Sequence, residues 1–281
     1  MDPRLVFDIG LSNGDDSRYY LDLGYSVVGV EANPLRVDEC KLRFEKEIEQ
    51  GRMKVVNLGV LKQPGSFTFY RNLVMDDRSS FVQRDGNQED WEEIEIRCVT
   101  TRDLIDEHGT PYFMKVDIEG ADLQALATLP LSNCPPYVSL ELGSTGEEIL
   151  NRLIELSYTA FKFIDGESHW HTRRILNDEY GWRLLRKLSR SAPFIRTTIS
   201  SLPQSLRNRG EWNPTEIYNP DSYAFGPLSS GPFGERAAGS WKTMNASRAF
   251  LRDLQEYARK VGRGNWIWWD VHARHGSVSG R

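Results

Sequence analysis

The feature that most constrains the fold is a glycine-containing turn between two apolar segments, followed by a lone acidic residue. Leu5–Phe7 leads into the turn at 8–14 (DIGLSNG), and Ser26–Val30 ends at Glu31. We expect two short buried strands here, joined by a helix over about 15–23. In α/β proteins such a turn lets the backbone approach a nucleoside, the free N–H groups of the helix start face the ligand, and the acid binds the ribose hydroxyls.

The spacing of the glycines discriminates between ligands. Gly10 and Gly14 form GxxxG, which differs from the GxGxxG that packs a dinucleotide pyrophosphate against a helix. Asp8, Asp15 and Asp16 place three carboxylates at the same turn, where they would repel a diphosphate and suit a cation. S-adenosylmethionine carries an ammonium and a sulfonium. The residues therefore favour a methyl donor over NAD.

Strands and helices alternate along the first 165 residues. Further apolar runs predict strands at 53–58, 112–117, 137–142 and 160–165, half-exposed strands at 66–70 and 93–99, and a final strand at 265–271 after a helix at 247–261. Such alternation predicts a parallel sheet covered on both faces. Its ligand is expected outside the carboxyl ends of the strands, where Glu31, Asp117, Glu119 and Glu141 would converge.

Composition excludes several classes of protein. The net charge of −5 argues against a nucleic-acid-binding protein. Three distant cysteines form neither a CxxC pattern nor a disulfide framework, and we expect reduced thiols in a cytoplasmic protein. No signal peptide and no apolar stretch of membrane-spanning length are visible.

The charge is unevenly distributed along the chain. Residues 173–209 contain nine Lys or Arg and two acids, and 181–190 (GWRLLRKLSR) predicts a short basic amphipathic helix. Two interpretations stay open. The helix is solvated and packs its apolar side inward, or it faces an anionic substrate, lipid head groups or nucleic acid.

Several motifs together resemble the FkbM-type methyltransferases. They cover roughly residues 5–165 and are FDIGLSNGDDS (7–17), VEANP (30–34), VNLGV (56–60), SSF (79–81), CVTTRDL (98–104), FMKVDIEGADLQAL (113–126) and YVSLEL (137–142). KVDIEGAD (115–122) is the most specific of them. SSGPFGE (229–235) and WWDVHAR (268–274) are similar to the tail of bacterial members.

The resemblance implies an α/β fold of the class I methyltransferase (Rossmann-like) type, with a seven-stranded, mostly parallel sheet and a long insertion before an antiparallel last strand. It implies O-methylation of a hydroxyl on a sugar, glycolipid or polyketide-like small molecule. It also implies a set of S-adenosylmethionine-binding residues around the glycine turn and the next two strand ends. They are Asp8, Gly10, Asn13, Gly14, Ser17, Glu31, Ala32, Leu58, Gly59 and Asp117.

Methyl transfer to an alcohol needs alignment and a base. Asp117 and Glu119 are candidates at the end of the fourth core strand, where one could instead cap the next helix, and His169 is a candidate just after the sixth. Asp117, Glu119 and Glu141 would also suit Mg²⁺, although no spacing demands a metal. His272 and His275 are expected at the far end of the last strand.

We divide the chain into an S-adenosylmethionine-binding core (1–165), an insertion (166–264) and a last core strand with tail (265–281). The family's N-terminal covering helix has no counterpart before the first strand, so the insertion is expected to form a substrate lid. Its aromatic residues and a turn that presents a carboxylate suit that role: Trp170, Trp212, Tyr218, Tyr223 and 231–235. The alternatives are an NAD-dependent oxidoreductase or epimerase, and a cofactor-binding protein without turnover.

Overall fold

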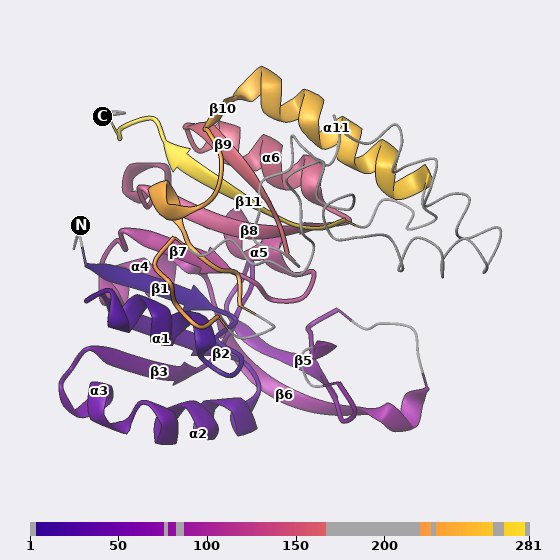
Figure 1. Cartoon of the computed structure of the whole chain (residues 1–281). Coiled ribbons are helices and arrows are strands. Elements are labelled where there is room, and N and C mark those ends of the chain that lie inside the picture. Colours follow the sequence, from indigo (N-terminus) through magenta and orange to yellow (C-terminus); the bar gives the residue numbers. More distant parts are fainter. Residues whose placement is uncertain are drawn as a thin grey trace, which may run out of the picture.

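An eight-stranded sheet in the order β10-β9-β11-β8-β7-β1-β2-β3 forms the centre of the protein (Figure 1). The computed structural model describes residues 4–75, 78–82, 87–166, 220–225, 229–260 and 267–278. The strands of this sheet are β1 (Leu5–Ile9), β2 (Ser26–Glu31), β3 (Met53–Asn57), β7 (Phe113–Val116), β8 (Tyr137–Gly143), β9 (Tyr158–Asp165), β10 (Lys242–Thr243) and β11 (Ile267–His275).

The directions of the strands agree with the arrangement that the resemblance implies. β3, β2, β1, β7 and β8 pair in parallel, whereas β11 is inserted antiparallel between β8 and β9. The predicted antiparallel last strand is confirmed. The sheet has eight strands where seven were expected, because β10 pairs with the edge of β9 over two residues. A pairing this short leaves no periodic signal in the sequence.

A second sheet of three strands, in the order β4-β6-β5, stands at one edge of the first. It consists of β4 (Gly59–Val60), β5 (Gly65–Asn72) and β6 (Trp91–Val99), and the last two form an antiparallel hairpin. Figure 1 shows this hairpin projecting from the side at which the arrows of β1 and β3 end. It therefore flanks the carboxyl ends of the parallel strands.

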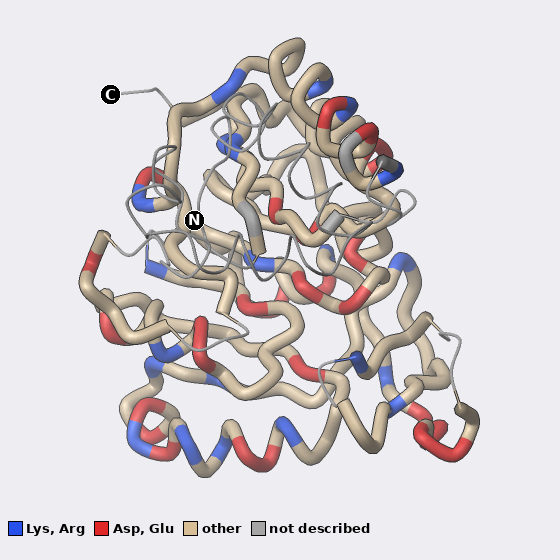
Figure 2. Tube along the Cα trace, turned by 45° about the vertical axis from the view of Figure 1, so that its right-hand side comes forward, with Lys and Arg blue, Asp and Glu red and all other residues tan. Residues whose placement is uncertain are grey.

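Seven α-helices and three short 3₁₀ turns are found among the described residues. They are α1 (Asp15–Asp22), α2 (Pro34–Arg43), α3 (Glu45–Glu49), α4 (Thr101–His108), α5 (Asp122–Ala127), α6 (Gly146–Glu155) and α11 (Met244–Lys260), with η2 (Gln88–Asp90), η3 (Leu131–Asn133) and η4 (Gly234–Arg236). The outer helices α2 and α3 carry both signs of charge along their length (Figure 2).

The apolar residues at helical spacing over 34–50 predict a single helix, and this prediction is wrong in one respect. Phe44 interrupts it with φ −109° and ψ 18°, which separates α2 from α3. The Phe44 ring is fully buried, and a Cβ on Gly14 would lie 2.4 Å from it. The tertiary contact with the glycine turn outweighs the local helical pattern.

The two faces of the main sheet bury different kinds of side chain. One face is apolar and packs Phe7, Met114 and Leu140 against the buried side chains of α4, α5, α6 and α11. The opposite face includes Val6 and Phe113 and is covered by α1, by Cys40 and Phe44, and by Phe233. Because side chains alternate along a strand, Asp8 and Lys115 lie on this second face. It is the face that carries buried polar groups to the site.

Candidate active site

The glycine turn after β1 is built for close approach. Gly10 has φ +86°, and a Cβ there would lie 1.8 Å from the Asp117 carbonyl oxygen. Its N–H and that of Leu11 both donate to the Val30 carbonyl, at 2.9 and 3.1 Å. A side chain at Gly10 would therefore force apart the ends of β1 and β7, where the backbone turns toward the cavity.

Glu31 connects the two loops beside this turn. Its Oε2 accepts a hydrogen bond from the Ser12 N–H and its Oε1 accepts one from the Asn33 N–H, both at 2.8 Å. Asn33 also caps α2, because its side chain accepts from the Leu35 N–H. Glu31 is 9% exposed and lines the cavity. The carboxylate is thus fixed in place beside the turn, and each of its oxygens can accept more than one hydrogen bond.

A cavity of about 540 Å³ opens at the carboxyl ends of the parallel strands. This volume lies within the range of small-molecule sites. The main sheet and its loops contribute one wall, and the β5–β6 hairpin contributes the other. The hairpin wall contains Phe69, Asn72, Val74, Met75, Arg78, Ser79, Phe81, Asp90 and Trp91.

The loop after β7 is held in a strained conformation. Glu119 has φ +55° and Gly120 has φ +94°, so two successive residues are left-handed. Ser80 donates from its Oγ to the Glu119 carbonyl at 2.8 Å, and Asp122 accepts from the Gly120 N–H at 3.1 Å. Burial, together with the charge of Asp117, raises the pKa of Asp122 to about 7. Strain of this kind persists where the surroundings over-determine it, as they do at functional sites.

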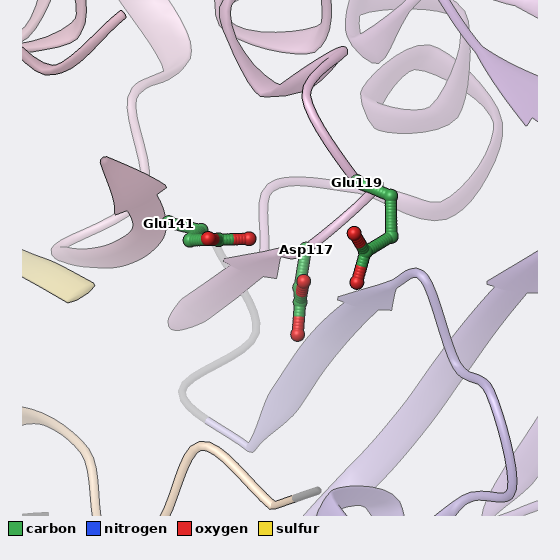
Figure 3. Close-up of side chains that lie close together, drawn as sticks. All are labelled: Asp117, Glu119 and Glu141. Atoms are coloured by element: carbon green, nitrogen blue, oxygen red, sulfur yellow. The ribbon is translucent and has the colours of Figure 1, made fainter. Parts of the chain in front are cut away.

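Three carboxylates converge over the end of β7 and β8. Oxygen atoms of Asp117, Glu119 and Glu141 lie within 4.8 Å of one another, and Figure 3 shows the side chains facing a common point. Burial raises the pKa of Glu141 to about 10, with further contributions from the charges of Asp117 and Glu119. Glu141 therefore holds a proton at neutral pH. That proton relieves the repulsion within the cluster, and a divalent cation would compete with it for the same oxygens.

Lys115 is a buried cation that the sequence did not single out as a site residue. It lies on β7, lines the cavity and is 4% exposed. Its Nζ is 3.0 Å from an Asp16 oxygen, 3.3 Å from an Asp117 oxygen and 3.7 Å from an Asp8 oxygen. Burial alone would lower the pKa of Lys115, but these carboxylates outweigh it and raise the pKa well above its ordinary value.

Most of the predicted site residues meet at the cavity. The structure brings eight of them to its wall: Gly10, Asn13, Glu31, Ala32, Leu58, Gly59, Asp117 and Glu119. Asp8, Gly14 and Ser17 do not line it. Ser17 is buried and donates to Asp8 at 2.6 Å, and Gly14 packs on Phe44, so these three support the turn from behind. Asn13 has its side-chain oxygen engaged by the Asp15 N–H at 3.0 Å.

The residues that sequence reasoning missed come from two places. A lone Lys within the apolar run 113–116 was the available signal for Lys115. Among the hairpin residues only the SSF motif (79–81) gave a signal, because the approach of the others to the cavity depends on how the second sheet meets the first. Trp268 lines the cavity at the start of β11, whereas His272 and His275 do not line it.

Part of the insertion lies outside the described residues. This applies to His169, Trp170, Trp212, Tyr218 and the basic segment 181–190. Tyr223 packs against Tyr19, with ring centroids 5.0 Å apart. Glu235 does not face the cavity. Its carboxylate accepts from the Tyr137 hydroxyl, the Trp241 Nε1 and the Arg274 guanidinium, beside the start of β8. None of the helices in the described part of the chain is sufficiently long and apolar to cross a membrane.

Solved structures of methyltransferases show limited likeness to the chain. Methyltransferase FkbM from Methylobacillus flagellatus KT is 19% identical, with a TM-score of 0.35, over 49% of this chain and 32% of that one. The chain thus spans about a third of the length of that protein. StiE O-MT (residues 942–1257) is 9% identical with a TM-score of 0.40, over 99% of this chain and 71% of that one.

A third structure is the O-methyltransferase from a trans-AT PKS multienzyme of Brevibacillus brevis in complex with S-adenosyl-L-homocysteine. It is 10% identical with a TM-score of 0.38, over 98% of this chain and 68% of that one. No curated protein matches the chain.

The family model of the methyltransferase FkbM domain matches residues 8–184, which is more than half of the 281 residues. The match includes the glycine turn, Glu31 and the loop from Asp117 to Asp122, which meet around one cavity. The chain belongs to the FkbM methyltransferase family.

Proposed function

We propose that the protein is an S-adenosylmethionine-dependent methyltransferase that methylates a hydroxyl on a sugar, glycolipid or polyketide-like small molecule. One observation carries the proposal: a single cavity collects the glycine turn, the fixed Glu31 carboxylate and the Asp117–Glu119 loop at the carboxyl edge of the sheet. These are the groups expected to hold the methionine half, the ribose and the reacting methyl of the cofactor.

The charges of the cavity support a cationic cofactor. Seven acidic residues contribute to its wall, against three basic ones: Asp15, Asp16, Glu31, Asp90, Asp117, Glu119 and Glu141, with Arg36, Arg78 and Lys115. An excess of carboxylates attracts an ammonium and a sulfonium and repels a diphosphate. This favours S-adenosylmethionine over NAD, in agreement with the glycine spacing. The bound cofactor would supply an electrophilic methyl group.

The residues of this chain would align the acceptor hydroxyl and take its proton. Asp117 and Glu119 present carboxylates at the cavity, and we assign the base to one of them or to His169. Glu141 is protonated at neutral pH and serves better as a hydrogen-bond donor to the acceptor. We do not assign a metal to this step, since no ligand spacing in the sequence demands one.

The hairpin wall suggests the character of the acceptor. Among the described residues, eight large apolar side chains are strongly exposed, and four of them lie between 73 and 82: Leu73, Val74, Met75 and Val82. Val74 and Met75 also line the cavity. Exposed apolar clusters mark binding surfaces. We infer an acceptor with a hydroxylated part in the acidic chamber and an apolar part against the hairpin.

The insertion completes the proposed site as a substrate lid. Residues 242–260 form β10 and α11 of the core, and 229–241 pack on the sheet, so the lid is assigned to the segment before them. The basic segment 181–190 belongs to it, and an anionic acceptor or a lipid surface is its proposed partner.

Turnover is tested by incubating the protein with labelled methyl donor and cell extracts, and measuring S-adenosylhomocysteine. The proposal predicts a labelled, extractable small molecule and stoichiometric S-adenosylhomocysteine. Tight binding of S-adenosylmethionine without product in any extract would indicate a binding protein without turnover.

A further inference from the structure

The SSGPFGE segment (229–235, hereafter the strap) runs across the polar face of the sheet, from the site to the start of β8. The Ser229 hydroxyl donates to Asp16, and the Ser230 N–H donates to both Asp16 oxygens at 3.1 and 3.0 Å. Asp16 is 5% exposed and lies in the first turn of α1. The strap is therefore anchored on a residue that also lines the cavity.

The rest of the strap packs firmly on the same face. The Phe233 ring stacks on that of Phe113 at 4.1 Å and 7°, and it contacts Tyr20 edge-on. Lys162 donates from β9 to the carbonyls of Gly234 and Ala237, at 3.0 and 2.7 Å. Phe113 lies two residues before Lys115, on the same side of β7. The strap thus covers the face from which Lys115 reaches the cavity.

Lys115 connects this cover to the reacting end of the site. Its ammonium lies 3.0 Å from Asp16 and 3.3 Å from Asp117. Asp117 is the most exposed of the three aspartates around the ammonium, with 31% of its side chain accessible, whereas Asp8 and Asp16 are at 0% and 5%. A single cation therefore links one buried carboxylate that holds the strap with another that faces the cavity.

Burying the Lys115 ammonium and its carboxylate partners costs free energy of folding. Burying an ion pair rarely adds stability compared with an apolar side chain of similar volume. Burial also raises the pKa of Asp8 to about 7, so this carboxyl is only partly ionised near neutral pH. A methionine at position 115, packed beside Phe113, would close the same face without these charges. The cost is explained if the fixed position of Asp117 is needed at the site.

We propose that Lys115 is a positioning residue, which holds the Asp117 carboxylate at the methyl-bearing end of the cofactor and, through Asp16, fixes the strap at the same point. This inference rests on the proposed function. Without the ammonium, the carboxylates repel one another, and Asp117, the exposed member, leaves its position. S-adenosylmethionine would then lose more affinity than S-adenosylhomocysteine, since only the former carries the sulfonium charge.

The test measures both ligands by calorimetry on Lys115→Met, Asp117→Asn and the double variant. We expect Lys115→Met to weaken S-adenosylmethionine about tenfold or more and S-adenosylhomocysteine about threefold or less. When Lys115→Met is added to Asp117→Asn, the further loss of S-adenosylmethionine affinity should be only about twofold, because the two residues act as a unit. An equal loss for both ligands, or a loss that persists in full without Asp117, would overturn the proposal.

Lys162→Met is the matched control. Lys162 is a second buried lysine under the same strap. It donates to the carbonyl of Gly234 in the strap and to that of Ala237 just after it, and its ammonium lies over the Trp241 ring. If Lys115 merely holds the strap, Lys162→Met should reproduce the loss of ligand discrimination, and the proposal fails.

Should Lys115→Met not fold, Ser229→Ala loosens the anchor on Asp16 while the Ser230 N–H remains. We expect a selective loss for S-adenosylmethionine of about twofold to fivefold, and an unchanged ratio would count against the proposal. Failure of the wild-type protein to bind either ligand would instead reject the proposed function.

Discussion

Glu31 shows how a single carboxylate can serve both the ligand and the backbone. It accepts from the N–H groups of Ser12 and Asn33, each at 2.8 Å, and so joins the glycine turn to the start of α2. The sequence placed this acid at the strand end correctly. It could not reveal that the same oxygens hold both loops, because Ser12 approaches only once β1 and β2 have paired.

Glu31→Ala should weaken S-adenosylmethionine at least about tenfold, since charge-assisted hydrogen bonds contribute about 1.5–3 kcal/mol each. It should also lower the thermal midpoint, because two N–H groups lose their acceptor. Glu31→Gln keeps one acceptor oxygen and should restore part of the midpoint. Calorimetry and thermal unfolding report the two effects, with the exposed Asp38→Ala on α2 as control. An unchanged dissociation constant for Glu31→Ala would remove Glu31 from the ribose site.

Glu141 should impose a pH dependence on stability. Its pKa is about 10 in the folded protein and 4.5 ordinarily, so the folded protein keeps a proton that the unfolded chain releases. The contribution of Glu141 to the free energy of unfolding is therefore fully present at acid pH, and it is lost as the pH rises from about 4.5 towards 10. Glu141→Gln cannot ionise, so its thermal midpoint should exceed that of the wild type at alkaline pH and match it near pH 4. The exposed Glu148→Gln on α6 should leave the profile unchanged, and equal pH slopes for Glu141→Gln and wild type would contradict the assignment.

At the scale of elements, the hairpin β5–β6 is the least predictable part of the site. Its strands were recognised from their alternating pattern, but its approach to the cavity was not. The contact depends on Ser80, whose hydroxyl reaches the Glu119 carbonyl across 39 residues of sequence. No local pattern encodes such a pairing. The anchor of the strap on Asp16 is hidden for the same reason, since Ser229 lies 213 residues from it.

The exposed apolar tip of the hairpin should contribute to acceptor binding and not to cofactor binding. The double variant Val74→Ser/Met75→Ser removes two cavity-lining apolar groups, which should cost about 1 kcal/mol, or about fivefold in affinity. Octyl glucoside below its micelle concentration serves as probe, with intrinsic tryptophan fluorescence as readout, since Trp91 and Trp268 line the cavity. S-adenosylmethionine affinity should stay constant. Leu131→Ser, also exposed but outside the cavity wall, is the control; an identical change there would reject the hairpin as a specific surface.

The lid assignment can be tested by deletion. Residues 229–260 belong to the strap and the core, so only 176–219 should be replaced by a short Gly/Ser linker. We expect S-adenosylmethionine to bind as before, and methyl transfer to the native acceptor to be abolished. Transfer at the wild-type rate would show that this segment is not the lid.

At the scale of the whole molecule, the order of the elements was predicted well. Alternating strands and helices fix a parallel sheet, and its carboxyl edge gathers Gly10, Glu31 and Asp117 as expected. The alternating pattern did not predict which charged side chains are buried on the second face of the sheet. There Lys115 and Asp8 are buried and Glu141 is half-buried, and sequence alternation reports only that such positions point away from the apolar face.

The central claim is that this cavity binds S-adenosylmethionine. Calorimetry with S-adenosylmethionine and, separately, NAD on the same preparation tests it most directly. The geometry and charge of the cavity predict a stoichiometric, saturable isotherm with S-adenosylmethionine and no heat of binding with NAD. Binding of NAD in preference to S-adenosylmethionine, or of neither, would contradict it.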